Sequence, residues 1–290
     1  MDLFFQIFVN SLVIGSLYGA IAMSFALAYR TTRFFNLAHG SMAAIGGYTF
    51  FWMRDSLGAD FIISLPVGIL VAGVAGFLID RFIYAPQRQR KASSTVLLVV
   101  SLGVVTVIEA VLSMVFGPQF RPLVTAEHIS SFQIGPVFIT QVQIWIIAVN
   151  LLIFGGLIAL LYKSKFGRMI RAIADDCDVA RTLGIRTDYY IGIMFFIAAA
   201  IAGLVGILNG LDTGLQPTMG FYLLLKGIVA SIIGGVGSIP GALLGGLLLA
   251  VVENAGVFTI GSEWRDAIAF VLLLVFLAFR PQGILGKEGK

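Results

Sequence analysis

Charged side chains are scarce in this sequence: Asp, Glu, Lys and Arg make up 12% of its 290 residues. Ordinary soluble domains carry about 25%, so the shortage argues against that class. The single cysteine, Cys177, excludes an intrachain disulfide and a cysteine-based metal site. Two histidines stand far apart and form no metal-ligand pattern. The net charge of +4 does not indicate nucleic-acid binding, because the basic residues stand at the ends of apolar segments.

Apolar residues are abundant instead, at 59% of the chain with a mean hydropathy of +0.99. Most apolar segments have the roughly 20 residues that a bilayer core requires, and lipid favours helices because every backbone polar group must be satisfied. The segments are 3–29, 34–53, 61–84, 94–116, 138–162, 189–211, 221–237, 238–258 and 265–280. The sequence therefore predicts an all-α polytopic membrane protein with eight or nine transmembrane helices in one domain, residues 1–290. No Lys or Arg precedes the first segment, which favours an uncleaved span over a signal peptide.

The number of crossings depends on segments 221–237 and 238–258, which are rich in glycine and divided by a proline. They are either two crossings or a re-entrant pair. A spacing of four between glycines favours close helix packing. Broken half-helices beside a cavity are the alternative. The residues concerned are Gly234, Gly235, Gly237, Pro240, Gly241 and Gly245.

Basic residues predict the orientation, because cytoplasmic loops are enriched in Lys and Arg. Alternate loops hold 15 of the 19 basic residues. The opposite loops hold only Arg54, Arg121 and Arg265, and Lys226 lies within a span. With nine crossings, we expect the N-terminus outside, the C-terminus in the cytoplasm, loop 117–137 outside and loop 163–188 inside.

Residues 163–188, called the charged segment below, carry 10 of the 34 charged residues. An apolar stripe at helical spacing predicts a helix over 168–185 that ends near Gly184; it comprises Met169, Ile173, Cys177, Ala180 and Leu183. Opposite charges predict ion pairs between Arg171 and Asp175 and between Asp178 and Arg181. An interfacial lipid-surface helix is the alternative, but three aspartates favour a protein partner. The candidate docking residues are Arg168, Arg171, Asp175, Asp176, Asp178, Arg181 and Gly184.

Polar residues within apolar segments are costly in lipid and are therefore candidates for a translocation path. They are Asn36, His39, Glu109, Asn209 and Lys226. Structural alternatives stay open for four of them: a helix cap for Asn36, packing for His39, a buried pair for Glu109 and snorkelling for Lys226. Glu253 and Asn254 lie near the outer end of their segment, where we expect them to face water.

No G-x-x-x-x-G-K-[ST] motif occurs, so the chain lacks the P-loop that cradles ATP phosphates. No nucleophile–base arrangement or metal spacing indicates an intramembrane enzyme. We therefore expect that the chain is not an enzyme and binds no cofactor of its own.

Four blocks resemble the branched-chain amino acid permeases of ABC importers. They are NLAHGS (36–41), RAIADDCDVARTLGI (171–185), LKGIVASIIGGVGSIPGALLGG (225–246) and RPQGILG (280–286). The second block is similar to the cytoplasmic loop that docks into the ATPase. The resemblance, to LivH-type subunits, implies a bacterial inner-membrane importer of branched-chain or other neutral amino acids. The partners that the resemblance implies are a second, LivM-type permease, two ATPase subunits that bind the ATP, and an external solute-binding protein.

Three other functions remain open at this point. A proton-driven secondary transporter would use Glu109 or His39 as its carrier. A urea, amide or sugar permease of the same superfamily would differ only in cargo. A non-transporting scaffold fits poorly, because no large part of the chain lies outside the membrane.

Overall fold

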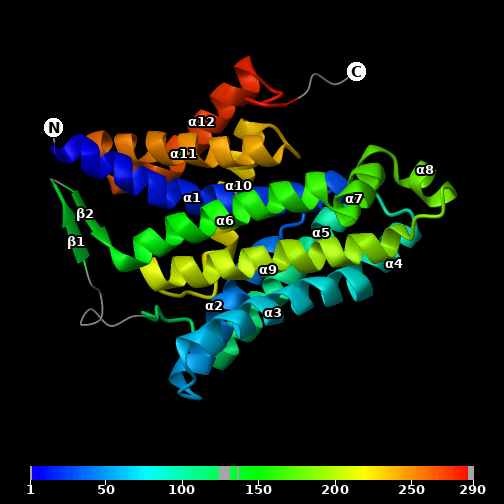
Figure 1. The fold of residues 1–290 in the computed structure, drawn as a ribbon, viewed down its shortest axis with the longest axis horizontal. Helices are drawn as coiled ribbons and strands as arrows, with labels where there is room; N and C mark the ends of the chain where they lie inside the picture. The colour runs from blue at the N-terminus through cyan, green and yellow to red at the C-terminus, as the bar shows by residue number, and fades with distance from the viewer. Residues whose placement is uncertain (1, 124–130, 136, 287–290) are drawn as a thin grey trace. The chain divides into compact units, whose positions relative to one another are not determined.

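The computed structural model describes residues 2–123, 131–135 and 137–286, and 81% of the structure is helical (Figure 1). The first half contains α1 (Asp2–Thr32), α2 (His39–Asp55), α3 (Phe61–Ile79), the π-turn η1 (Asp80–Tyr84), α4 (Ala85–Gln89) and α5 (Ser94–Phe116). Strands β1 (Ser131–Ile134) and β2 (Val137–Thr140) lead to α6 (Gln141–Lys163), α7 (Lys165–Asp175) and α8 (Cys177–Thr182). The chain continues through α9 (Thr187–Thr213), α10 (Met219–Gly234), α11 (Ile239–Ile260), the 3₁₀ turn η3 (Ser262–Trp264) and α12 (Arg265–Phe279).

Each of the nine predicted apolar segments contains a helix, which confirms the all-α polytopic class. In the described part of the chain, six helices are long and apolar enough to cross a bilayer: α1, α3 continued through α4, α5, α6, α9 and α11. Helices α2, α10 and α12 have 17, 16 and 15 residues. These three are shorter than the roughly 20 residues of a full crossing.

Two compact units divide the chain. One contains residues 27–123 and 155–224 and is called the α2–α9 unit. Helices α2, α3 and α9 pack together in it (Figure 1). Glycines allow this packing: a β-carbon at Gly46 would overlap the backbone of Gly203, and one at Gly206 would overlap Ala43. Helix α2 is consequently buried along most of its length.

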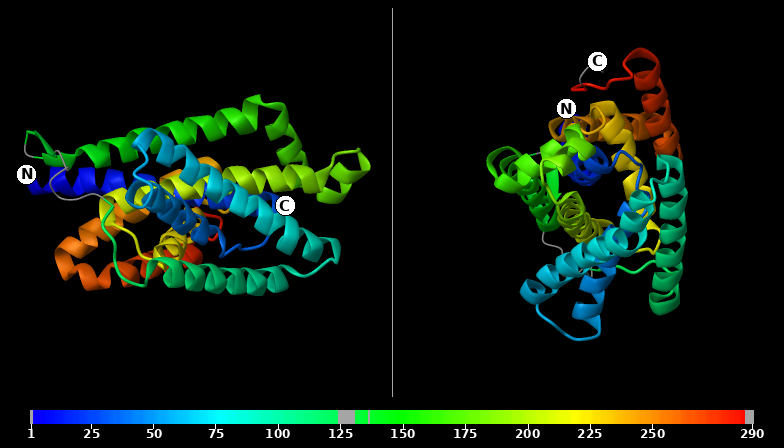
Figure 2. Two further views of the ribbon diagram at one scale, coloured as in Figure 1. Left: turned by 90° about the horizontal axis from the view of Figure 1, so that it is seen from below. Right: turned by 90° about the vertical axis from the view of Figure 1, so that its right-hand side faces the viewer.

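The other unit contains residues 1–26, 124–154 and 225–290 and is called the α11 unit. Helix α12 packs against α11 (Figure 2), and a β-carbon at Gly246 would overlap the backbone of Gly19 in α1. The hairpin β1–β2 was not expected from the sequence. Its strands pair antiparallel, from Ser131 opposite Thr140 to Ile134 opposite Val137.

Candidate functional site

The charged segment begins with a tight turn between α6 and α7. The Ser164 hydroxyl accepts a hydrogen bond from the Gly167 N–H at 2.9 Å and so caps α7. A β-carbon at Gly167 would overlap the carbonyl groups of Leu160 and Leu161. Ile170, Ile173 and Ala174 are buried. The close turn and this apolar face fix α7 against its surroundings in the α2–α9 unit.

The predicted single helix over 168–185 is wrong, because the chain breaks at Asp176 between α7 and α8. Asp176 has an extended backbone, with φ −154° and ψ 112°, and its carboxylate accepts bonds from the N–H groups of Asp178 and Val179, each at 2.9 Å. An aspartate that caps a new helix start is more favourable here than one inside a continuous helix. The expected stripe therefore ends early, and Leu183 is 75% exposed.

The predicted ion pair between Arg171 and Asp175 is also wrong. The Arg171 guanidinium donates to the Leu161 carbonyl and lies over the Tyr162 ring, 5.3 Å from its centroid. It therefore binds α7 to the end of α6. Asp175 is exposed, and its carboxylate makes no ion pair with any described residue.

The second predicted pair is confirmed: Arg181 lies 3.8 Å from Asp178. The Arg181 guanidinium also donates to the hydroxyl of buried Thr187 at 3.3 Å, at the first residue of α9. Gly184 ends α8 as expected, with φ +82°. Its N–H donates to the Arg181 carbonyl, and the Ile185 N–H donates to that of Ala180. This pair of bonds is the Schellman arrangement.

Helices α7 and α8 and the residues that border them expose acidic and large apolar side chains close together in the chain. These residues, called the docking surface below, are Asp175, Asp176, Asp178, Val179 and Leu183, all exposed. Figure 2 shows α7 and α8 together at one end of α9. Exposed leucine and valine beside three carboxylates suit a partner surface with an apolar pocket and basic residues around it.

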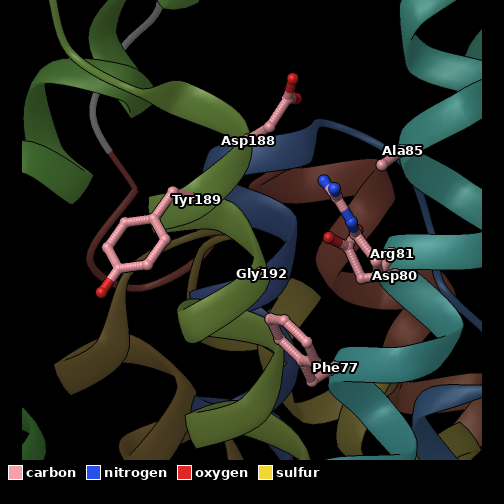
Figure 3. A pocket seen from close by; sticks show the side chains of 7 residues that line it. All are labelled: Phe77, Asp80, Arg81, Ala85, Asp188, Tyr189 and Gly192. Carbon is pink, nitrogen blue, oxygen red and sulfur yellow. The ribbon is translucent and has the colours of Figure 1, made fainter.

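A cavity of about 290 Å³ lies in the same unit (Figure 3). Its lining consists of Phe77, Asp80, Arg81, Ala85, Asp188, Tyr189 and Gly192, from the end of α3, the π-turn, α4 and the start of α9. The Asp80 carboxylate is 2% exposed and accepts hydrogen bonds from the two terminal guanidinium nitrogens of Arg88, Nη1 and Nη2, at 2.6 and 3.2 Å. This fork fixes the π-turn to α4.

Among the translocation candidates, the structure brings Asn36 and His39 together before and at the start of α2. Both are buried. The Asn36 side chain accepts from the Ala38 N–H at 3.1 Å and from the Tyr84 hydroxyl at 2.8 Å. It therefore turns the chain into the helix, although the cap position itself is Ala38.

Glu109 and Asn209 are half-buried on α5 and α9. The Asn209 amide bonds Thr213 in its own helix at 3.1 Å. Glu109 and Asn209 thus lie on helices other than α2, the helix that begins at His39.

Lys226 lies in the α11 unit and is held by two carboxylates. Its ammonium group is 2.7 Å from Glu253 and 2.8 Å from Asp266. Glu253 also accepts from the Tyr18 hydroxyl at 3.1 Å and is 1% exposed. The expectation that Glu253 faces water is wrong, because it is the buried partner of Lys226. Asn254 donates to Ser11 at 3.1 Å.

The glycine-rich block forms a turn between two helices. Gly235 and Gly237 have φ of +106° and +84°, and Ser238 caps α11 by accepting from the Gly241 N–H at 3.2 Å. Pro240 is a helix-start residue, where its missing N–H does no harm, and it breaks no helix. Gly237 therefore lies outside the packing face expected for it. Gly234 lies in close contact with the backbone of Gly241, and Gly245 with that of Ala230.

The RPQGILG block closes the end of α10. The N–H groups of Ile284 and Leu285 donate to the carbonyls of Ile233 and Gly234 at 2.8 and 3.0 Å. Helix ends leave such carbonyls without partners inside the helix. Two of the four sequence blocks therefore meet in space.

A family model described as "Branched-chain amino acid transport system / permease component" matches residues 7–277. The chain belongs to this family. The permease is 32% identical over 295 residues to the high-affinity branched-chain amino acid transport system permease protein BraD of Pseudomonas aeruginosa, covering 98% of this chain and 96% of BraD.

Two further relatives have similar coverage. LivH of Escherichia coli K12, a high-affinity branched-chain amino acid transport system permease protein, is 32% identical over 300 residues, with 98% of this chain and 96% of LivH covered. A probable branched-chain amino acid transport permease protein LivH of Methanocaldococcus jannaschii is 28% identical, with 97% and 92% covered. These relatives are named for transport and for no catalysed reaction. The permease is thus a multi-pass membrane transport protein.

Sequence reasoning missed four residues that organise the site: Arg33, Asp80, Tyr84 and Arg88. The Asp80–Arg88 pair spans eight residues, because the π-turn between them changes the helical register. An acidic residue at the end of an apolar segment, followed by arginines, was the available signal. Arg33 has a left-handed backbone, with φ +54°, which no sequence pattern indicates.

Proposed function

We propose that this chain is the membrane-spanning permease subunit of an ATP-driven importer for branched-chain or other neutral amino acids. The docking surface on α7–α8 would receive the movement of an ATPase, which binds the ATP. One observation carries the coupling role: α7 and α8 are exposed on the docking surface and joined to membrane helices at both ends. Arg171 binds α6, and Arg181 binds the start of α9.

The proposed assembly contains two permeases, this chain and a LivM-type partner, with two ATPases on the cytoplasmic side. A solute-binding protein delivers the amino acid outside. This arrangement puts the charged segment and the C-terminus in the cytoplasm and the N-terminus outside, as the basic residues favour. All of residues 1–290 would act as one transmembrane permease domain, with 163–188 as its coupling loop. Asn36, His39, Glu109, Asn209 and Lys226 remain candidates for the translocation path.

Charge reversal tests the docking role. We expect Asp175→Arg with Asp178→Arg to weaken ATPase co-purification and reduce uptake about tenfold, because both exposed carboxylates would meet the partner. The matched control is Asp55→Arg with Asp60→Arg, the same double reversal at two exposed carboxylates, at the end of α2 and just before α3, which should leave ATPase co-purification unchanged. Binding and uptake of the double variant equal to those of the wild type would refute docking at this surface.

Uptake by purified components tests the class and the cargo. Proteoliposomes that contain both permeases and the ATPases should accumulate radiolabelled leucine, isoleucine or valine only under two conditions. ATP must be present on the side of the membrane that carries the ATPases, and the binding protein must be present on the opposite side. The secondary-transporter alternative predicts uptake by this chain alone in a pH gradient. Such uptake would contradict the importer.

A further inference from the structure

The junction between α1 and α2 has a strained backbone at a charged residue. Arg33 adopts φ +54°, in the left-handed region that residues with a β-carbon rarely occupy. Its N–H donates to the Tyr29 carbonyl at 2.8 Å and ends α1. Strain of this kind persists where surrounding contacts over-determine the conformation, and it concentrates at functional sites.

The Arg33 side chain contacts the last turn of α7. Its Nη2 donates to the Ala174 carbonyl at 3.0 Å. The last four carbonyls of a helix have no partner within the helix, and a cation at that end also meets the negative end of the helix dipole. Arg33 thus caps α7, the first of the two helices that carry the docking surface, although 141 residues separate Arg33 from Ala174 in the chain.

The residues that follow Arg33 are held by two further elements, the π-turn and α5. The Tyr84 hydroxyl, at the end of the π-turn, donates to Asn36, and the Leu37 N–H donates to the Ser101 hydroxyl of α5 at 3.1 Å. Two residues later α2 begins, and its glycines lie in direct contact with α9. A shift of the Ala174 carbonyl therefore has a short path through bonded groups to the central helix of the unit.

We infer that the segment 33–38 is a mechanical relay that carries movement of α7 into α2, with Arg33 as its positioning residue. This inference rests on the proposed coupling function. The NLAHGS block would then transmit movement of α7, in addition to lining the translocation path. Arg33 acts through the Ala174 carbonyl and need not touch either amino acid or ATPase.

A matched pair of glycine substitutions tests the relay. Lys91 is the second non-glycine residue with positive φ, at +55°, among the described residues, and it is exposed after α4. Arg33→Gly and Lys91→Gly both remove a positive charge and relieve a left-handed backbone. Only the first removes the contact with α7. Each variant is assayed in the full complex for ATP hydrolysis, amino acid uptake and ATPase co-purification.

We expect Lys91→Gly to keep the wild-type amount of uptake per ATP hydrolysed. Arg33→Gly should still co-purify with the ATPases and hydrolyse ATP, while uptake per ATP falls about tenfold, the size of a typical coupling effect. Arg33→Lys, which keeps a donor and a charge, should recover part of the ratio. If Arg33→Gly fails to accumulate, Arg33→Asn replaces it, because asparagine tolerates this backbone but is too short to reach Ala174.

Two failures are distinguishable. An unchanged uptake-to-ATP ratio in Arg33→Gly, with normal complex formation, overturns the relay and leaves the docking role standing. The docking role itself is overturned if no ATPase co-purifies with the wild-type permease. It is also overturned if the Asp175→Arg, Asp178→Arg variant binds the ATPase as the wild type does. A fall in uptake for Lys91→Gly as large as for Arg33→Gly would also overturn the relay, because the effect would then come from charge or backbone alone.

Discussion

At the residue scale, the Lys226 ammonium group depends on two carboxylates of different exposure. Glu253 is 1% exposed, whereas Asp266 is 69% exposed. Breaking a buried pair leaves an uncompensated charge, but removing both charges often restores stability. An exposed carboxylate near the same ammonium contributes much less.

We predict that Lys226→Met destabilises the protein by about 3–5 kcal/mol, because Glu253 keeps a buried charge without its partner. The double variant Lys226→Met with Glu253→Gln should recover most of that loss. The exposed partner serves as control, and Asp266→Asn should change stability by about 1 kcal/mol or less. Melting temperatures in detergent, read by size-exclusion fluorescence, measure the three variants. A double variant less stable than the single one would contradict this account.

Local charge patterns predicted some residue pairs and missed others. Asp178 and Arg181 are neighbours on one helical turn, so their spacing sufficed. Arg171 binds a carbonyl ten residues earlier, across a tight turn that charge spacing does not describe. Glu253 and Lys226 lie 27 residues apart on different helices, so only their packing shows that they form a pair.

At the scale of elements, glycines set the distance between α2 and α9. A β-carbon at Gly206 would overlap the backbone of Ala43, which a side-chain rotation cannot relieve. Gly103 on α5 is the opposite case, with open space around its β-carbon position. The same substitution at both sites therefore separates helix packing from helix propensity.

We predict that Gly206→Ala destabilises the protein by about 1–3 kcal/mol, because the two helices must move apart. Gly103→Ala should be neutral or stabilise by up to about 1 kcal/mol, since alanine favours helix more than glycine does. Thermal unfolding in detergent compares the two. Equal effects would contradict the packing argument.

The extent of an apolar run in the sequence predicted the first and last residues of some helices correctly. The segment 94–116 coincides with α5, whose start is capped by the Ser93 hydroxyl through the Val96 N–H at 3.3 Å. The division of 168–185 was missed, because aspartate is tolerated on an exposed helix face and is also a strong cap. The choice between these roles depends on how Arg33 and Arg181 hold the two short helices, and that is tertiary information.

At the scale of the whole molecule, one part of the chain supplies hydrogen-bond donors to the end of a helix that is distant in the sequence. The C-terminal RPQGILG block satisfies the end of α10, about 50 residues earlier, within the α11 unit. Gly283, with φ +75°, lies against the backbone of Gly235, where a β-carbon would overlap. Truncation of this block, or substitution within it, should therefore also destabilise the end of α10.

We predict that Gly283→Ala destabilises the α11 unit more than Gly58→Ala destabilises the α2–α9 unit. Both glycines have a left-handed backbone, at φ +75° and +61°, so both substitutions cost about 1–2 kcal/mol in strain. Only Gly283 also meets backbone atoms, because nothing lies near the β-carbon position of Gly58. Hydrogen exchange at Ile284 and Leu285 should rise in Gly283→Ala alone. Unchanged exchange there would argue against the closure of α10.

Strand β2 of the hairpin has an edge at which the side chain of Gln6 binds the backbone. The Gln6 side-chain amide accepts from the Phe138 N–H at 2.9 Å and donates to the Phe138 carbonyl at 3.0 Å. It takes the place that a third strand would occupy. Free strand edges invite pairing with other chains. Gln6 therefore occupies the backbone groups of Phe138, which another chain would otherwise have to bind to add a strand at this position.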